Sequence, residues 1–205
     1  MLSPETESAP ISEEIIGSIT VVRFSLPSQK NTFSTEMLNG LSATLDRVKT
    51  SPSLRAVIFT GTADAFASGA NIKELVRLDA SQAAEFSRRG QQLMDEIAKL
   101  DQMTIAAING FCMGGALDFA LACDIRIASK SAVFAHPGSK LGIITGWGGT
   151  QRLPRLVGKA KAIELFSTAR RFSSDEALQA GLITRIADPV LTAAIVIAEN
   201  YISTS

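Results

Sequence analysis

The order of apolar and polar positions along this chain predicts strands that alternate with helices. A β-branched and aromatic run from Glu13 to Ser25 indicates one or two strands, broken near Gly17-Ser18. Short apolar runs that are bounded by turn residues predict buried strands further along. These runs are 54–60, 105–108, 125–128, 132–135 and the last one, LITRIAD, 182–188.

Apolar residues at helical spacing fill the intervals between these runs. Ser34 is placed as the N-cap of a helix that runs to about Lys49. Ser173 and Glu176 form a capping box for a short helix that stops at Gly181. Further helices are predicted over 81–100, from Gly114-Gly115 onward, over 159–168 and over 189–202. The alternation predicts an α/β fold in which helices cover a mostly parallel sheet.

Composition excludes several classes of protein. The 205 residues suffice for one domain with a substantial core, and 20 basic side chains balance 20 acidic ones, which argues against non-specific nucleic-acid binding. No apolar run reaches membrane-spanning length and the first residues lack a signal core, so we expect a soluble, cytoplasmic protein. Cys112 and Cys123 lack metal-ligand spacing and are interpreted as reduced packing residues. Residues 1–12 are expected to form a disordered tail.

Two glycine-containing corners, each after a predicted strand, are candidate sites for binding an oxyanion. Gly69-Ala70 and Gly114-Gly115 each leave a backbone N–H close to a potential ligand, and two such donors form an oxyanion hole. Asp118 follows Gly115 by about one helical turn, so its carboxylate can face the same ligand. The alternative is that these glycines serve tight packing of helices and strands.

Four segments of the chain together resemble the enoyl-CoA hydratase/isomerase (crotonase) family. They are LRAVIFTGTADAFASGANIKEL, IAAINGFCMGGALDFALACDIRIAS, LGIITGWGGTQRLPRLVGKAKAIEL and RFSSDEALQAGLITRIAD, and the likeness covers Ile15 to Asp188. The resemblance implies a crotonase-like ββα superfold that binds acyl-CoA thioesters over residues 13–188. The family continues for several dozen helical residues beyond this point, so 189–205 are expected to be a shortened C-terminal helical region.

The resemblance also assigns roles to individual residues. It places the oxyanion-hole N–H groups on Ala70 and Gly115, with Gly114 beside them. It places the loop that binds coenzyme A on Ala67, Ser68, Gly69, Ala70, Asn71 and Ile72. Lys73 is either a contact to the phosphates or a solvated loop lysine. No metal and no cofactor is implied, because coenzyme A enters as part of the substrate.

Departures from the family pattern concern the acid/base groups. Family hydratases use two glutamates, and their positions fall on Asp118, one methylene shorter, and on Gly138, which cannot transfer a proton. Gly138 is instead expected to leave room for a bulkier acyl group. His136, the only histidine, either replaces the missing acid/base opposite Asp118 or merely shapes the pocket. Trp147 either lines the acyl pocket or is a core or interface tryptophan.

The sequence therefore predicts an acyl-CoA enzyme that stabilises a thioester enolate, with enoyl-CoA hydratase or lyase chemistry of the kind found in fatty acid metabolism as first choice. Decarboxylation, C–C cleavage or thioester hydrolysis is the alternative within the family. A non-catalytic CoA-binding or scaffold protein is the alternative outside enzymes. We expect a homo-oligomer, a trimer or a dimer of trimers, with no nucleic-acid or membrane partner.

Overall fold

A computed structural model describes residues 9–204, which fold around two sheets. The larger sheet has six strands in the order β1-β2-β3-β5-β7-β10. β1 and β2 form an antiparallel hairpin, and every later neighbour pairs in parallel. The bounds are β1 Ile11–Ile16, β2 Ile19–Phe24, β3 Ala56–Thr60, β5 Met103–Ile108, β7 Ile125–Ala128 and β10 Arg185–Ile186. The mostly parallel sheet predicted from the sequence is confirmed.

The smaller sheet has four short strands in the order β4-β6-β8-β9. They are β4 Ala65–Ala67, β6 Phe111–Met113, β8 Val133–Ala135 and β9 Phe172–Ser173. β4, β6 and β8 are parallel to one another, and β9 pairs antiparallel with β8. Each of these three parallel strands follows a strand of the large sheet after a few residues. The ββα superfold that the resemblance implied is therefore present.

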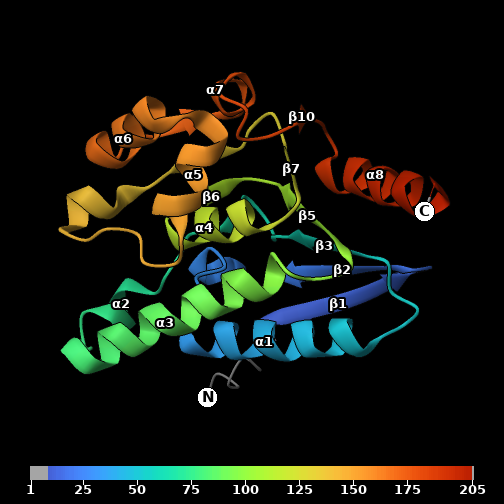
Figure 1. Ribbon diagram of the computed structural model, residues 1–205, viewed down its shortest axis with the longest axis horizontal. Coiled ribbons are helices and arrows are strands. Elements are labelled where there is room, and N and C mark those ends of the chain that lie inside the picture. The colour runs from blue at the N-terminus through green and yellow to red at the C-terminus, as the bar shows by residue number, and fades with distance from the viewer. Residues whose placement is uncertain (1–8, 205) are drawn as a thin grey trace, which may run out of the picture.

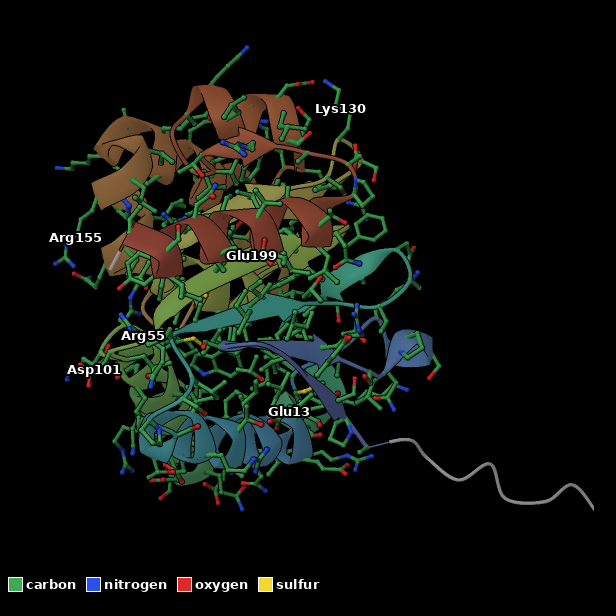
Figure 2. The ribbon with its side chains drawn as sticks, turned by 90° about the vertical axis from the view of Figure 1, so that its right-hand side faces the viewer. Glu13, Arg55, Asp101, Lys130, Arg155 and Glu199 are labelled. Atoms are coloured by element: carbon green, nitrogen blue, oxygen red, sulfur yellow. The ribbon has the colours of Figure 1, made fainter. Side chains whose placement is uncertain are left out.

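Helices cover the large sheet on both faces, as Figure 1 shows. α1 (Thr35–Thr50) and α3 (Ala80–Ile97) lie side by side on one face, and α8 (Val190–Thr204) crosses the other, which Figure 2 shows with Glu199 on its outward side. The remaining helices are α2 Ile72–Leu75, α4 Gly115–Ala122, α5 Gly149–Val157, α6 Lys159–Thr168, α7 Ser174–Gln179 and two 3₁₀-helices, Pro27–Gln29 and Pro137–Leu141. None of the helices within residues 9–204 is long and apolar enough to cross a membrane.

Alternation along the strands divides the core into two layers. Val57 and Phe59 point from β3 toward α1, α3 and α4, whereas Ala56 and Ile58 point toward α8. All four side chains are fully buried, as expected for a parallel strand that is covered on both faces. Phe119 of α4 is the centre of the first layer. Its ring contacts those of Phe24, Phe33, Phe59 and Phe66, with centroids 4.9 to 6.3 Å apart.

Several sequence-based boundaries need correction. A disordered tail was expected over 1–12. Residues 1–8 lie outside the described residues, and the expectation is wrong for Ile11 and Ser12, which pair with β2 as part of β1. β4 and β6 lie where the sequence predicted a loop and a turn, since strands of three residues carry too short a pattern to detect. The strand expected over 182–188 is reduced to Arg185–Ile186.

The capping box at α7 is only half formed. The Ser173 side chain accepts a hydrogen bond from the Glu176 N–H, as predicted. The Glu176 carboxylate, however, pairs with Arg170 and Lys161 instead of returning to the Ser173 backbone. Two cations compete for this carboxylate, and a charged partner is a stronger one than a neutral N–H.

Candidate active site

Three candidate positions, two glycine-containing corners and one histidine, follow the carboxyl ends of three neighbouring parallel strands. Gly69-Ala70 comes after β4, Gly114-Gly115 after β6 and His136 directly after β8. Parallel strands end at the same edge of a sheet, and ligands of α/β proteins bind outside such edges. The small sheet therefore brings together positions that lie far apart in the sequence.

The backbones of the two predicted oxyanion segments are in contact. A β-carbon placed on Gly69 would lie 3.0 Å from the Gly115 nitrogen and 2.5 Å from the Met113 carbonyl oxygen. Only a residue without a side chain fits there, and its φ of +90° also favours glycine. Within residues 9–204, neither the Ala70 N–H nor the Gly115 N–H donates to a protein acceptor. Both residues are half-buried.

Residues 30–33 hold the Ala70 segment in place. The Phe33 N–H donates to the Gly69 carbonyl at 2.7 Å, and the Asn71 N–H donates to the Phe33 carbonyl at 3.1 Å. These two bonds bracket Ala70 and leave its own N–H unused. The second donor is fixed differently, because Gly115 is the first residue of α4, where an N–H has no partner inside the helix.

Asp118 lies one turn into α4 and is completely buried, with 0% of its surface exposed. Its Oδ2 accepts a hydrogen bond from the Thr145 hydroxyl, which belongs to the loop before α5. The same loop crowds the carboxylate, since a β-carbon on Gly149 would lie 2.1 Å from Asp118 Oδ1. Asp118 therefore anchors the loop that covers it.

Burial sets the protonation of this carboxyl. Desolvation raises the pKa of Asp118 from an ordinary 3.8 to about 6, against the lowering effects of the Thr145 hydroxyl, the backbone of Trp147 and Gly149, and the charge of Arg152. A carboxyl group with a pKa near the working pH can both take and release a proton, which is the property that a general acid/base needs.

His136 is the nearest titratable neighbour of Asp118. Its Nε2 lies 3.4 Å from Asp118 Oδ1, and its ring packs on Phe166 of α6 with centroids 4.9 Å apart. Only 3% of the side chain is exposed, and this burial lowers the pKa of His136 from 6.5 to about 4. The structure thus places His136 beside the acid/base candidate. This position is required by the alternative in which His136 acts as a second acid/base group opposite Asp118.

The segment predicted to bind coenzyme A is partly committed to protein contacts. The Ser68 and Thr32 hydroxyls are hydrogen-bonded at 2.8 Å, and the Asn71 side chain caps α2 by accepting from the Lys73 N–H. Ala67 is buried in β4. Ile72 and the Lys73 side chain are exposed, so they are the members of the segment that present side chains to solvent.

Trp147 is a core tryptophan, with 3% of its surface exposed. Its indole lies between two glycines: a β-carbon would come within 2.0 Å of the ring from Gly90 of α3 and within 2.5 Å from Gly115. Phe86 packs on the ring with centroids 5.2 Å apart. The indole therefore fills the space directly beside the Gly115 amide.

The expectation that Gly138 leaves room for a bulkier acyl group is wrong. A β-carbon on Gly138 would lie 2.6 Å from the Ile143 carbonyl oxygen, so the backbone of the following loop occupies the space. The same contact leaves no room for a glutamate at this position without movement of the loop. Both the residue type and the path of the local backbone therefore exclude a glutamate side chain at position 138.

Sequence reasoning missed the residues that surround the acid/base candidate. Thr145 donates to the Asp118 carboxylate, Gly149 lies against it, and Arg152 binds the Trp147 carbonyl and the Asp95 carboxylate. Gly90 was unremarkable inside a predicted helix, although it makes the space for the indole. The Gly148-Gly149 pair was the available signal for close approach, but nothing in the sequence indicated what approaches.

Two surface hollows lie away from the Ala70 and Gly115 amides. One, of about 460 Å³, is lined by Arg23, Thr60, Asn109, Ser129 and Asp188 among others, at the carboxyl edge of the large sheet. The other, of about 490 Å³, borders Thr145 on the side of α5 and includes Arg152 and Arg155. Arg155 extends outward from the molecule in Figure 2. Within residues 9–204 no cluster of three His, Cys, Asp or Glu side chains is arranged to hold a metal ion.

Comparison with known proteins gives a consistent result. The family model described as enoyl-CoA hydratase/isomerase matches residues 14–204. The short-chain-enoyl-CoA hydratase of Clostridium acetobutylicum is 36% identical over 174 residues, which are 84% of this chain and 67% of that protein. The crotonyl-CoA hydratase of Syntrophomonas wolfei is 37% identical over 172 residues, 83% of this chain and 66% of that protein. The chain spans about two thirds of the length of the curated relatives it matches.

Solved structures agree with these relatives. Enoyl-CoA hydratase from Bacillus anthracis superposes with a TM-score of 0.90 at 36% identity, covering 93% of this chain and 76% of that one. DspI from Pseudomonas aeruginosa superposes with a TM-score of 0.92 at 30% identity, covering 100% of this chain and 85% of that one.

Proposed function

This chain belongs to the enoyl-CoA hydratase/isomerase family, and we propose that it hydrates an enoyl-CoA thioester. In the proposed complex the thioester oxygen accepts hydrogen bonds from the Ala70 and Gly115 N–H groups. Asp118 exchanges protons with the water that adds to Cβ and with Cα. The exposed Lys73 and Ile72 contact coenzyme A, together with the backbone of residues 67–71.

The observation that carries this proposal is the pair of unused amides. Ala70 and Gly115 come from separate strand ends, lie on segments in backbone contact, and donate to no acceptor within residues 9–204. Addition of water to the β-carbon of an enoyl thioester places negative charge on the carbonyl oxygen, and each donor aimed at that oxygen is worth about 3 kcal/mol. A water molecule carries no such charge, so these donors stabilise the transition state more than they would stabilise a bound water.

Asp118 is the proton-transfer group of the proposed reaction. It lies on the helix that Gly115 begins, so the same rigid element carries the oxyanion donor and the carboxyl. The relatives named as short-chain-enoyl-CoA and crotonyl-CoA hydratases support a reaction of this type. Trp147 beside Gly115 favours a short acyl group, because the indole occupies the adjoining space.

A second candidate is a non-catalytic protein that binds acyl-CoA. The position that the family resemblance assigns to a second glutamate holds Gly138, and the Ile143 backbone packs against it. Other enolate reactions of the family, decarboxylation among them, need fewer proton-transfer groups and form the remaining alternative. The three candidates differ in what the purified protein turns over.

Turnover of a substrate panel tests the proposal. We expect hydration of crotonyl-CoA, which is measured as loss of the absorbance of its conjugated enoyl thioester. We expect no reaction of a malonyl-type thioester. Asp118→Asn is expected to lower kcat at least about 100-fold while thioester binding persists. Asp175→Asn is a matched control, because this carboxylate pairs with Lys130 at an exposed site. Binding of every thioester without turnover would instead support the non-catalytic protein.

We further propose that the protein is a cytoplasmic homo-oligomer. Exposed apolar side chains support the oligomer: Leu141, Ile143 and Ile144 lie on the segment before α5, and Ile163 lies on α6, which packs against the 3₁₀-helix Pro137–Leu141. Light scattering of the purified chain tests the oligomer. We expect a trimer or a dimer of trimers, and Ile144→Lys to shift the distribution toward the monomer. A wild-type protein that is monomeric at micromolar concentration would contradict this.

A further inference from the structure

Two buried polar atoms in the site have no hydrogen-bond partner. Asp118 Oδ1 and His136 Nε2 are 3.4 Å apart, and among the described residues neither makes a hydrogen bond. An unpaired buried polar atom destabilises the folded protein, so two of them facing each other need an explanation. A small ligand that contacts both atoms satisfies them together.

The two residues are held firmly, which keeps this gap in place. Asp118 Oδ2 is occupied by Thr145, which turns Oδ1 toward the histidine. His136 is fixed at the junction of β8 and the 3₁₀-helix Pro137–Leu141, with its ring against Phe166. A water that bridges Oδ1 and Nε2 therefore has a defined position relative to α4 and to the Gly115 amide at its start.

We propose that Asp118 and His136 act as one proton-transfer pair, in which both side chains bind the reacting water and His136 supplies the second acid/base group that Gly138 lacks. This inference rests on the proposed hydration of an enoyl-CoA thioester. It makes His136 a catalytic residue, because its Nε2 contacts the water that reacts.

The proton balance of the reaction closes within this pair. At rest the Asp118 carboxyl carries one proton and the His136 ring is neutral, with its proton on Nδ1. His136 Nε2 accepts a proton from water as the water oxygen bonds to Cβ, and the electron pair of the C=C bond moves to Cα, which takes the proton from Asp118. The imidazolium then returns one proton to the carboxylate across the 3.4 Å gap. One water has been added, and the pair is restored.

Burial favours this resting form, because it disfavours charge on both groups. The pKa of Asp118 is raised to about 6 and that of His136 is lowered to about 4. The other charged or titratable groups that face the pair are Arg152 from α5, which favours the carboxylate, and the buried Cys112 thiol of β6, whose pKa is raised well above its usual range. Cys112 therefore stays neutral and adds no charge.

The pH dependence of kcat/KM separates the pair from Asp118 acting alone. A pair that works in its one-proton form gives a bell, whose upper limb falls at about 6 or above as that proton is lost. Asp118 acting alone as a base gives a rate that rises through pH 6 and then stays level. The bell is the expected result with crotonyl-CoA as substrate.

Variants supply the second arm of the test. His136→Gln keeps a polar side chain that does not titrate, and it is expected to lower kcat at least about 100-fold and to remove the bell. The double variant with Asp118→Asn is expected to be no slower than the slower single variant, because the two residues act as a unit. Lys140→Ala, an exposed change in the same 3₁₀-helix, is the control and is expected to retain wild-type rates.

The outcomes are distinct. A level alkaline rate together with His136→Gln activity within threefold of wild type overturns the pair and leaves the proposed hydratase intact. A wild-type protein that binds crotonyl-CoA and turns over no thioester overturns both. If His136→Gln does not fold, the NMR titration of the wild type decides: coupling makes the Asp118 carboxyl carbon and the His136 ring each report both protonation steps, whereas signals that each follow only one step contradict the pair.

Discussion

The backbone of Gly69 lies directly against that of Gly115, so that a β-carbon on Gly69 would come within 3.0 Å of the Gly115 nitrogen. The contact joins the end of β4 to the start of α4. In the proposed complex this contact brings the Ala70 and Gly115 amides to one ligand, because neither segment alone offers two donors. The geometry of the proposed oxyanion hole therefore depends on a residue that donates nothing to it.

Gly69→Ala is expected to reduce activity without removing any functional group. The new methyl group meets the Met113 carbonyl oxygen and the Gly115 nitrogen, and alanine is strained at a φ of +90°, so the two segments must separate. We expect kcat/KM for crotonyl-CoA to fall at least about 100-fold, comparable to loss of one oxyanion donor. Gly142→Ala is a control for backbone strain, since Gly142 also has positive φ but a β-carbon there meets open space. Equal losses in both variants would contradict this account.

Because Trp147 packs against Gly90, Gly90→Ala is predicted to have opposite effects on the free energy of unfolding in the wild type and in a Trp147→Ala variant. Gly90→Ala alone is expected to destabilise the protein, because the methyl group overlaps the indole, although alanine normally stabilises a helix interior by up to about 1 kcal/mol over glycine. In a Trp147→Ala background the indole is gone, and the same change is expected to stabilise. Urea unfolding followed by circular dichroism measures both steps. The same sign in both backgrounds would show that Gly90 does not make room for the indole.

Trp147→Ala itself is expected to lower the free energy of unfolding by about 3 to 5 kcal/mol, the usual cost of truncating a buried tryptophan. Because Trp147 is the single tryptophan of the chain, its fluorescence also reports on the site. We expect acyl-CoA binding beside Gly115 to change this fluorescence. Unchanged emission at saturating ligand would place the acyl group elsewhere.

The opposed pKa shifts of the buried pair predict opposite pH dependences of stability in two variants. Asp118 has a raised pKa, so its contribution is present below pH 3.8 and is lost as the pH rises through about 6. His136 has a lowered pKa, so its contribution is present above pH 6.5 and is lost as the pH falls through about 4. In the wild type the two slopes nearly cancel between pH 4 and 6.

When one residue of the pair is replaced, the pH dependence of stability that is due to the other residue becomes visible. Relative to wild type, Asp118→Asn is expected to lose stability as the pH is lowered from 6 to 4, and His136→Gln to gain it, each by about 1.4 kcal/mol per pH unit at most. Denaturation midpoints at several pH values measure both slopes. Parallel curves for the two variants and the wild type would contradict the assigned shifts.

Elements with a long local pattern could be predicted from the sequence. Elements that form only through contacts with distant segments could not. The helix over 159–168 was predicted with the observed bounds, and Ser34 caps α1 as expected, because both signals are local. β4 and β6 were missed, although they are the strands that place Ala70 and Gly115. Their three residues each are ordered by pairing with each other and with β8, which no local pattern encodes.

The candidate site shows the same division. The family resemblance gave positions 69–70, 114–115, 118 and 136 as the candidate site. The structure places 69–70, 114–115 and 136 after neighbouring strands of the small sheet, and Asp118 on the helix that Gly115 begins. The enclosure of Asp118 by Thr145 and Gly149, and the backbone that fills the space at Gly138, are results of tertiary packing. For this reason the expected space for a larger acyl group was wrong, while the role of the Asp118 carboxylate stays a prediction.

The convergence of two amides on one thioester oxygen is tested most directly by the NMR signals of the Ala70 and Gly115 N–H groups during titration with an unreactive acyl-CoA. Both amide protons are predicted to move downfield together, with one dissociation constant, and coenzyme A without an acyl group is predicted to leave them in place. Movement of only one of the two signals, or of neither, at saturation would contradict the proposed oxyanion hole.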